Sequence, residues 1–191
     1  MDNHFDVLVV GAGISGIGAG YHLQTKCPGK SYAILEGRET IGGTWDLFRY
    51  PGIRSDSDMY TLGFSFYPWK EKEAIADGPA ILNYLHETSE KFNIKEKIKF
   101  GHYVESASWS SDDSQWKLKV KSKEKTEIMT CNFIFMCSGY YSYKEGYTPD
   151  FEGINDFNGQ IVHPQKWTTD INYVDKNVLI PVRPSPMKDY K

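Results

Sequence analysis

The sequence predicts an α/β fold in which a parallel sheet carries a small antiparallel β insertion. Three observations lead to this prediction. An apolar run at residues 5–10 passes straight into a glycine-rich turn, a second apolar run lies at 31–35, and "FIFMCSG" forms a third at 133–139. Continuous apolar runs of this length are typical of parallel strands that are buried on both faces.

Strand and helix patterns alternate along the chain. Residues 5–10 are expected to form a strand, followed by a helix through about Gln24 and a strand at 31–35, which together require a right-handed crossover. From Gly42 to about Glu71 glycine, proline, arginine and aromatic residues are mixed, which favours a long functional loop. A helix is expected over "DGPAILNYLHETSEKFNI", with Pro79 in its first turn. Short antiparallel strands are expected at 104–109, 116–120 and 127–130, with "SDDS" as the first turn between them.

The composition is that of an ordinary soluble globular protein of 191 residues. A net charge of -3 argues against a nucleic-acid partner, because neutralising phosphates requires a basic face. No apolar run is long enough to cross a bilayer, and "MDNHFD" leads directly into a strand, so neither an integral membrane segment nor a signal peptide is expected. Peripheral membrane contact stays open. The three cysteines show no CxxC spacing, which predicts no metal site and reduced thiols in a cytoplasmic protein.

A glycine loop follows the first strand, where Gly11, Gly13 and Gly16 supply the pattern G-x-G-x-x-G. The first glycine permits a tight turn, the second lets a pyrophosphate touch the backbone, and the third lets helix and strand pack closely. The N-terminus of the following helix offers free N–H groups to the phosphates, and the N–H of Ser15 is one of them. This arrangement predicts a Rossmann-like dinucleotide site.

Glu36 ends the second strand at the place where such a site holds the ribose. A carboxylate there accepts hydrogen bonds from ribose hydroxyls and repels a 2′-phosphate, so the ligand is predicted to be FAD or NAD and not NADP. A second small-residue turn at Gly42 and Gly43, followed by Thr44 and Trp45, offers another close approach to the cofactor. An NAD-dependent dehydrogenase has no need of this turn, and the lack of CxxC weakens a flavin disulfide reductase. FAD is therefore favoured.

Four stretches, "GAGISG", "GGTWDLFRYPG", "RSDSDMYTLGF" and "FIFMCSG", resemble the class B flavoprotein monooxygenases, with the Baeyer–Villiger monooxygenases as the nearest branch. Phe157, Gly159, His163 and Trp167 match the pattern F-x-G-x-x-x-H-x-x-x-W of that branch. The resemblance covers residues 5 to about 180. It departs from the usual pattern at Asn132, where an acidic residue is common, and at Thr168, where proline or aspartate is usual.

The resemblance implies a role for each matching residue. Around the FAD pyrophosphate and adenosine ribose it places Gly11, Gly13, Ser15, Gly16 and Glu36. Along the inner part of the FAD site it places Gly43, Thr44, Trp45, Asp46 and Leu47. Val104 would meet adenine through its backbone, Asp56 would lie near the flavin ring, and NADPH would approach Arg54, Ser55 and Asp56. Arg49 and Arg54 could equally be loop residues that pair with nearby aspartates.

The activity that the resemblance implies is FAD- and NADPH-dependent oxygenation through a flavin C4a-peroxide. The partners would be O2 and a small ketone, thioether, thioamide or amine, which is converted by Baeyer–Villiger oxidation or by S- or N-oxygenation. The catalytic residue stays unknown, because the family's active-site arginine is expected beyond the C-terminus. The alternative is a flavin-binding fragment without turnover, and uncovered apolar surface would favour self-association.

The same resemblance divides the chain. Residues 1–155 would form the FAD-binding domain, and 156–175 a linker between domains that carries the F-x-G-x-x-x-H-x-x-x-W pattern. Residues 176–180 would be the first strand of a truncated NADPH-binding Rossmann domain, the rest of which is missing. The tail at 181–191 replaces the expected second glycine loop with three prolines, which cannot open a phosphate-binding helix. We therefore expect a C-terminally truncated chain.

Overall fold

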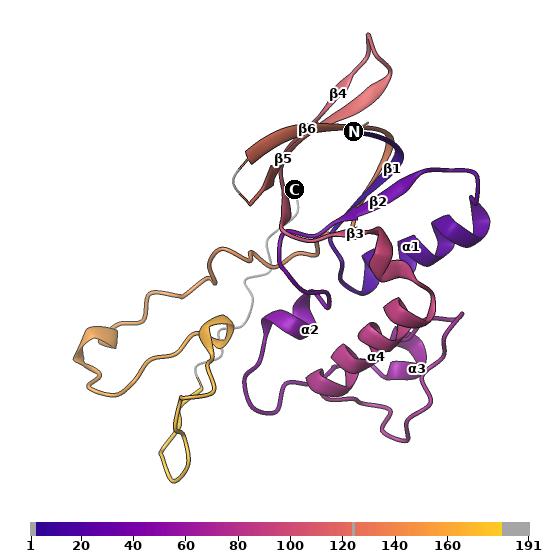
Figure 1. Ribbon diagram of the computed structural model, residues 1–191. Coiled ribbons are helices and arrows are strands. Elements are labelled where there is room, and N and C mark those ends of the chain that lie inside the picture. The colour runs from indigo at the N-terminus through magenta and orange to yellow at the C-terminus, as the bar shows by residue number, and fades with distance from the viewer. Residues whose placement is uncertain (1–2, 124, 181–191) are drawn as a thin grey trace, which may run out of the picture.

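A computed structural model describes residues 3–123 and 125–180. One six-stranded sheet runs in the order β3-β2-β1-β6-β5-β4 (Figure 1). Strand β1 (His4–Val10) lies in the middle and is parallel to β2 (Tyr32–Leu35) and to β6 (Lys125–Met136). Strand β3 (Ile98–Lys99) continues the parallel part beside β2. On the other side, β5 (Gln115–Ser122) pairs antiparallel with β6, and β4 (His102–Ser110) pairs antiparallel with β5. The predicted α/β fold is confirmed.

Strand β6 joins the parallel and the antiparallel part of the sheet. The strands expected at 127–130 and 133–139 form one strand that ends at Met136, because the backbone stays extended through Cys131 and Asn132. Its first half pairs antiparallel with β5 and its second half pairs parallel with β1, and Cys131 is opposite both Trp116 and Phe5. The predicted antiparallel insertion is therefore formed by β4 and β5, which extend the parallel sheet beyond β6.

Helices α1 (Ile14–Lys26) and α4 (Gly78–Lys91) cover one face of the sheet. Asp77 caps α4 by accepting a hydrogen bond from the N–H of Ala80 at 2.8 Å, and Ile81 and Leu85 are fully buried. This confirms the helix expected there. The apolar core on this face joins α1 and α4 to β1 and β2, and a second core lies on the other face, where Leu8 and Leu35 meet Leu118, Val120 and Met129.

The long loop at 42–71 contains more structure than expected. Two one-turn helices interrupt it, α2 (Thr44–Leu47) and α3 (Met59–Leu62). Asp58 caps α3 by accepting a hydrogen bond from the N–H of Thr61 at 2.9 Å. Single turns of this kind carry no apolar period, so the pattern analysis could not find them. The 3-10 turn Ile94–Lys97 and strand β3 were missed for the same reason.

The second half of β6 is far more exposed than a buried parallel strand should be. Phe133, Phe135 and Met136 are 56%, 41% and 63% exposed. Phe133 and Phe135 lie opposite Val7 and Val9, so their side chains point to the helix-covered face, but beyond the part that α1 and α4 cover. The prediction of the strand is confirmed, and the prediction that both of its faces are buried is wrong.

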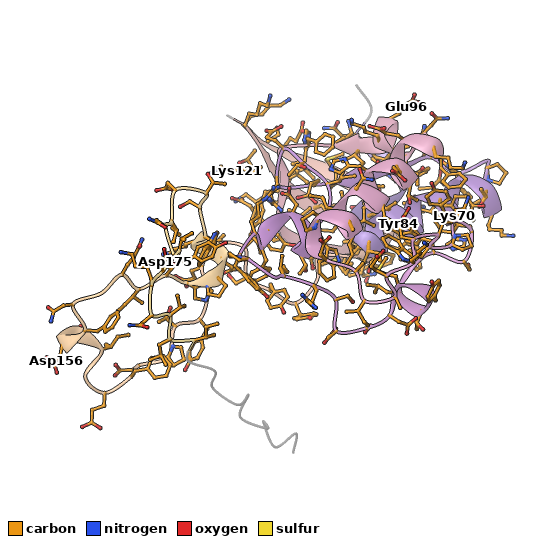
Figure 2. The ribbon with its side chains drawn as sticks, turned by 90° about the horizontal axis from the view of Figure 1, so that it is seen from below. Lys70, Tyr84, Glu96, Lys121, Asp156 and Asp175 are labelled. Carbon is orange, nitrogen blue, oxygen red and sulfur yellow. The ribbon has the colours of Figure 1, made fainter. Side chains whose placement is uncertain are left out.

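After β6 the chain forms an arm, residues 139–180, that lies beside the sheet and helices. Two 3-10 turns, Ile154–Asp156 and Pro164–Lys166, are its regular elements. Figure 2 shows Asp156 and Asp175 in this arm, apart from the packed body that holds Tyr84 and Lys70. None of the helices in the described part of the chain has the length and apolarity that a membrane crossing requires.

The strand expected at 176–180 does not form. These residues pair with no strand of the described chain, and Val178, Leu179 and Ile180 are 60%, 84% and 77% exposed. A strand exists only where a neighbour accepts and donates its backbone hydrogen bonds, and an apolar run cannot supply that neighbour itself. The tail at 181–191 lies outside the described residues.

Asp6 ties the start of β1 to the turn before β2 and makes the fold sensitive to acid. Its carboxylate accepts the N–H and the hydroxyl of Ser31, both at 2.8 Å, and the ammonium of Lys30 at 3.1 Å. The backbone hydrogen bond from Ser31 is the largest cause of an Asp6 pKa that falls from 3.8 to about 2. Because the pKa is lower in the folded state, the carboxylate stabilises the fold above pH 3.8, and this stabilisation is lost as pH falls toward about 2.

We therefore expect Asp6→Asn to lower the melting temperature at neutral pH. The difference from the wild type should shrink as pH falls from 3.8 to about 2. Thermal denaturation followed by circular dichroism over this range measures it. Asp112→Asn, in the exposed turn between β4 and β5, is the matched control and should match the wild type throughout. A melting difference for Asp6→Asn that is independent of pH would contradict the assignment.

Candidate functional site

The first glycine turn connects β1 to α1 and leaves no room for side chains. Gly11 has a φ of 104°, and a Cβ there would lie 2.5 Å from the carbonyl oxygen of Cys137 at the end of β6. A Cβ on Gly16 would overlap the carbonyl oxygen of Gly11. Ala12 is fully buried and Ser15 is exposed at the start of α1. The turn therefore presents bare backbone and the N–H groups of the first turn of α1, which suits a phosphate.

Glu36 lies beside this turn and is 8% exposed. One carboxylate oxygen accepts the N–H of Ala12 at 2.8 Å, and the other accepts the N–H of Arg38 at 3.0 Å. The N–H of His102, at the start of β4, donates to the carbonyl of Glu36 at 2.8 Å. Glu36 thus shapes the glycine turn directly, and each of its oxygens keeps a lone pair for a ligand hydroxyl.

The second glycine turn packs against the first. The N–H of Gly42 donates to the carbonyl of Ala12 at 3.0 Å. Gly42 and Gly43 have φ values of 110° and 55°, and a Cβ on Gly43 would lie 3.1 Å from the Cα of Gly13. The two turns, which are about thirty residues apart in sequence, therefore form one continuous stretch of glycine backbone.

Asp46 holds the second turn in place. It is 4% exposed, and its two carboxylate oxygens form ion pairs with Arg38 and Arg49. Arg38 also donates to the carbonyl of Gly43 at 3.4 Å. Both oxygens of Asp46 are thus used within the protein, so its place in the site is to position the glycine turn. A pairing of Arg49 with a nearby aspartate was one of the alternatives predicted from the sequence, whereas the pairing of Arg38 was not predicted. The feature of the sequence that could have indicated it is an arginine two residues after Glu36.

The remaining residues predicted at the inner FAD site line α2. Thr44 and Leu47 are partly buried, and Trp45 packs its indole against the core under α1 and α4. Val104 lies two residues after His102 in β4, opposite Val120, at a bulge in the strand. Because His102 is bonded to Glu36, the structure brings Val104 to the same edge as the predicted ribose position.

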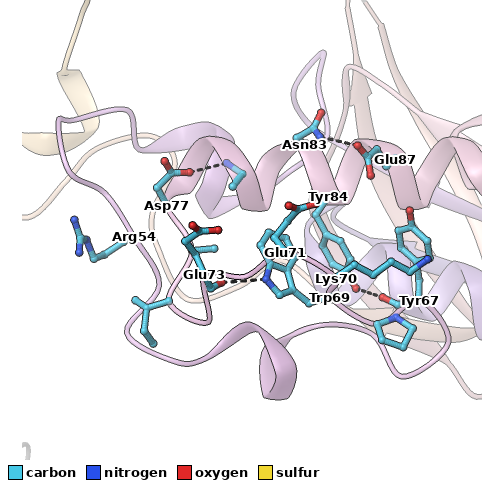
Figure 3. A pocket seen from close by; sticks show the side chains of 14 residues that line it. Arg54, Tyr67, Trp69, Lys70, Glu71, Glu73, Asp77, Asn83, Tyr84 and Glu87 are labelled. Atoms are coloured by element: carbon cyan, nitrogen blue, oxygen red, sulfur yellow. Dashed lines mark hydrogen bonds between the residues drawn. The ribbon is translucent and has the colours of Figure 1, made fainter.

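The segment Arg54, Ser55 and Asp56 stands apart from the glycine turns. Ser55 is 3% exposed and its N–H donates to the carbonyl of Ala76 at 2.9 Å. The Arg54 side chain lines a cavity of about 590 Å³ between the loop 67–77 and α4, shown in Figure 3. The pKa of the Tyr141 phenol is raised to about 12, chiefly by its hydrogen bond with Tyr140, and the charge of the exposed Asp56 nearby adds a smaller contribution. The structure therefore brings Asp56, and not Arg54, toward the arm.

The arm contributes side chains that the sequence analysis did not assign to the site. Tyr141 packs edge-on against Phe48, with ring centroids 5.0 Å apart. The hydroxyl of Tyr143 reaches the second glycine turn at Gly43. A cavity of about 730 Å³ lies between the arm and the loop after α2, with walls from both. Its lining residues include Phe48, Tyr50, Tyr140, Tyr141, His163 and Gln165.

Sequence comparison agrees with this geometry. The model of the flavin-binding monooxygenase-like family matches residues 5–182. The chain is 56% identical over 180 residues to the FAD-containing monooxygenase EthA of Mycobacterium tuberculosis, covering 94% of this chain and 37% of that protein. It is 47% identical over 181 residues to the probable FAD-binding monooxygenase AlmA of Acinetobacter sp, with 94% and 36% covered. The chain spans a little over a third of the length of these curated relatives.

Solved structures show the same architecture. A steroid monooxygenase bound to NADP matches with a TM-score of 0.73 and 31% identity, covering 87% of this chain and 32% of that one. OTEMO in complex with FAD and NADP matches with a TM-score of 0.70 and 28% identity, covering 87% and 31%. A cyclohexanone monooxygenase from Rhodococcus sp. Phi1 bound to NADP+ matches with a TM-score of 0.73 and 27% identity, covering 90% and 32%. From the glycine turns, the family match and these folds together, the chain belongs to the flavin-binding monooxygenase-like family.

Proposed function

We propose that this chain supplies the FAD-binding part of an FAD- and NADPH-dependent monooxygenase of the Baeyer–Villiger type. The observation that carries the proposal is the meeting of two glycine turns beside the buried carboxylate of Glu36. A long dinucleotide needs bare backbone along its pyrophosphate and an acid at its ribose, and this edge of the sheet has both. The named relatives are FAD-containing monooxygenases, which supports the same ligand.

The residues present fit FAD. A Cβ on Gly11 or Gly16 would collide with protein backbone, so these glycines permit the tight turn and the close packing of α1, and Gly13 is the one that the pyrophosphate can approach. In the proposal Gly11, Gly13, Ser15 and Gly16 hold the pyrophosphate, Glu36 holds the ribose, and the backbone of Val104 meets adenine. Gly43, Thr44, Trp45, Asp46 and Leu47 form the inner wall, with Asp56 toward the flavin ring. Arg54, Ser55 and Asp56 face NADPH.

When bound, FAD supplies hydride acceptance from NADPH and the activation of O2, and the protein supplies position and shielding. The N–H groups at the start of α1 neutralise the pyrophosphate, and Glu36 orients the adenosine end. The apolar indole of Trp45 and the ring of Phe48 exclude water from the inner end. The substrates in this proposal are a small ketone, thioether, thioamide or amine. No catalytic residue is assigned to this chain.

We further propose a domain organisation, a tendency to self-associate and a cellular location for this chain. Residues 1–155 are the FAD-binding domain and 156–175 a linker between domains. The exposed rings of Phe133 and Phe135, whose centroids lie 5.3 Å apart on one face of β6, favour self-association, because an exposed apolar surface is stabilised by burial against another molecule. The buried free thiol of Cys131 favours the cytoplasm, where thiols stay reduced.

A second candidate is a flavin-binding module without turnover, which the coverage of a little over a third of the relatives favours. Anaerobic addition of NADPH to the FAD-loaded chain separates the two functions. Rapid bleaching of the flavin band supports a chain that reduces its cofactor. An unchanged flavin band supports a binding module.

FAD binding itself is tested by titrating the 191-residue chain with FAD and following the visible band and the quenching of flavin fluorescence. We expect saturable binding. Glu36→Gln should weaken it by about tenfold or more, because an amide in place of a buried carboxylate cannot accept both backbone N–H groups and a ribose hydroxyl. Glu96→Gln, an exposed acid in the 3-10 turn before β3, is the matched control. A chain that takes up no FAD would overturn the proposed function.

A further inference from the structure

The first part of the arm, residues 139–147, lies across the proposed FAD site along its whole length. We name this segment the strap. Tyr141 contacts Phe48 at the inner end of the site. Tyr143 contacts the second glycine turn in the middle. Lys144 lies over the ring of Tyr103, the neighbour of Val104, with its nitrogen 5.3 Å from the ring centroid.

Tyr143 makes the decisive contact. The three atoms nearest to a Cβ built on Gly43 are the Cα of Gly13 at 3.1 Å, the hydroxyl oxygen of Tyr143 at 3.5 Å, and the nitrogen of Gly13 at 3.8 Å. The phenol thus stands where the two glycine turns meet. Its neighbours include the hydroxyl of Thr44, which hydrogen bonds to it, and the charges of Glu36 and Asp46. The guanidinium of Arg38 lies 5.8 Å from its ring centroid.

This position conflicts with a ligand on the glycine turns. Glycine is needed there because the ligand must come within contact distance of the backbone, and the phenol oxygen, 3.5 Å from the Cβ position of Gly43, already lies in contact with that position. A phosphate that contacts Gly13 and Gly43 and a phenol at the same junction would occupy the same volume. One of the two has to leave.

The tyrosines of the strap are only partly buried against the site, so the strap can be displaced. Tyr143 is 39% exposed and Tyr141 is 41% exposed, unlike the fully buried residues of the core. No helix or strand runs through the described residues 139–147. The strap is also joined to the rest of the arm, by a hydrogen bond from the Gln165 amide to the carbonyl of Ser142 at 2.7 Å and by close packing of Gly146 on His163. Segments with few buried apolar contacts are those that open at low free-energy cost.

We propose that the Tyr143 side chain and FAD compete for the junction of the glycine turns, so that FAD binding expels Tyr143 and opens the strap. The proposal rests on the proposed function, since the ligand is FAD. The strap is then in equilibrium between a closed conformation, in which Tyr143 lies at the glycine turns, and an open conformation that can bind FAD. The apparent dissociation constant of FAD then rises as the open fraction falls.

The variant Tyr143→Ala tests the competition in the full 191-residue chain. It should bind FAD about tenfold more tightly than the wild type, because a hydrogen bond and a cation–π contact each favour the closed strap by a factor of about 3 to 5. Tyr143→Phe keeps the ring and loses the hydrogen bond with Thr44, so it should lie between the two. Tyr173→Ala, in the arm outside the strap and 46% exposed, is the matched control and should equal the wild type.

Limited proteolysis of the strap with chymotrypsin, with and without FAD, provides a readout that does not depend on affinity. Expulsion of Tyr143 should make cleavage at the strap tyrosines faster when FAD is added. Slower cleavage, or equal or weaker binding by Tyr143→Ala, would overturn the competition while leaving FAD binding intact. If neither chain binds FAD, the proposed function fails and the strap proposal fails with it.

Discussion

Replacing Gly16 with alanine is expected to lower the free energy of unfolding by about 3 kcal/mol and to abolish measurable FAD binding. A Cβ on Gly16 would overlap the carbonyl oxygen of Gly11, which is backbone and cannot rotate away. Gly11 itself is held from both sides, by the hydrogen bond of its N–H to the carbonyl of Leu35 at 2.8 Å and by contact with Cys137. Helix α1 would have to move away from the sheet, and Ile17 and Val9, both fully buried in the core between them, would lose their packing.

Urea denaturation and FAD titration of the same protein measure both effects. Gly29→Ala is the matched control, because the Cβ position of Gly29 has no atom within 4 Å and its φ is not in the left-handed region. That variant should be neutral or slightly more stable, since alanine loses less backbone entropy than glycine on folding. Wild-type stability in Gly16→Ala would show that the close contact between α1 and β1 is not required.

Asp46→Asn is expected to weaken FAD binding by about tenfold and to cost about 1 to 3 kcal/mol of stability. Asparagine has the size of aspartate but lacks the negative charge that pairs with the guanidinium groups of Arg38 and Arg49. The amide N–H groups of the asparagine would also face one of these two cations. The Arg38 side chain would then hold the second glycine turn only through its bond to the carbonyl of Gly43. Arg38 and Arg49 are 29% and 60% exposed, so water solvates them in part, which keeps the cost below that of a fully buried pair.

Two variants calibrate this result. Arg49→Ala removes the more exposed partner and should cost less than about 1 kcal/mol, as exposed ion pairs do. Asp112→Asn changes the same residue type at an exposed turn and should change nothing. Urea denaturation and FAD titration again report stability and affinity. Equal FAD affinity in Asp46→Asn and the wild type would contradict the assignment of Asp46 as the residue that positions the turn.

Local patterns predicted the elements that local forces determine. The glycine spacing at 11–16 predicted a turn that only glycine can make, and the structure has a φ of 104° at Gly11 and no room for a Cβ at Gly16. Asp77 and Pro79 predicted the start of α4, where Asp77 is the N-cap. These predictions succeeded because a cap, a tight turn or an amphipathic period is decided by residues within one or two turns of each other.

Other features depend on residues far apart in sequence. Whether the apolar run at 133–136 is buried depends on what covers it, and the helices α1 and α4 stop short of Phe133 and Phe135. Whether 176–180 forms a strand depends on a partner strand, which the described chain does not provide. Apolar character alone therefore predicted the strand β6 correctly and its burial wrongly.

By itself, the sequence determined the glycine turns, the acid at the end of the second strand, and the order of strands and helices around them. The tertiary structure decided which charges and rings meet at that site. Arg38 forms an ion pair with Asp46, and the carboxylate of Glu36 accepts the N–H of Ala12. The hydroxyl of Tyr143 lies beside Gly43, which precedes it by a hundred residues in the sequence. The physical reason is that backbone conformation follows from short-range sterics, whereas an ion pair or a ring contact exists only after the chain has brought its two members together.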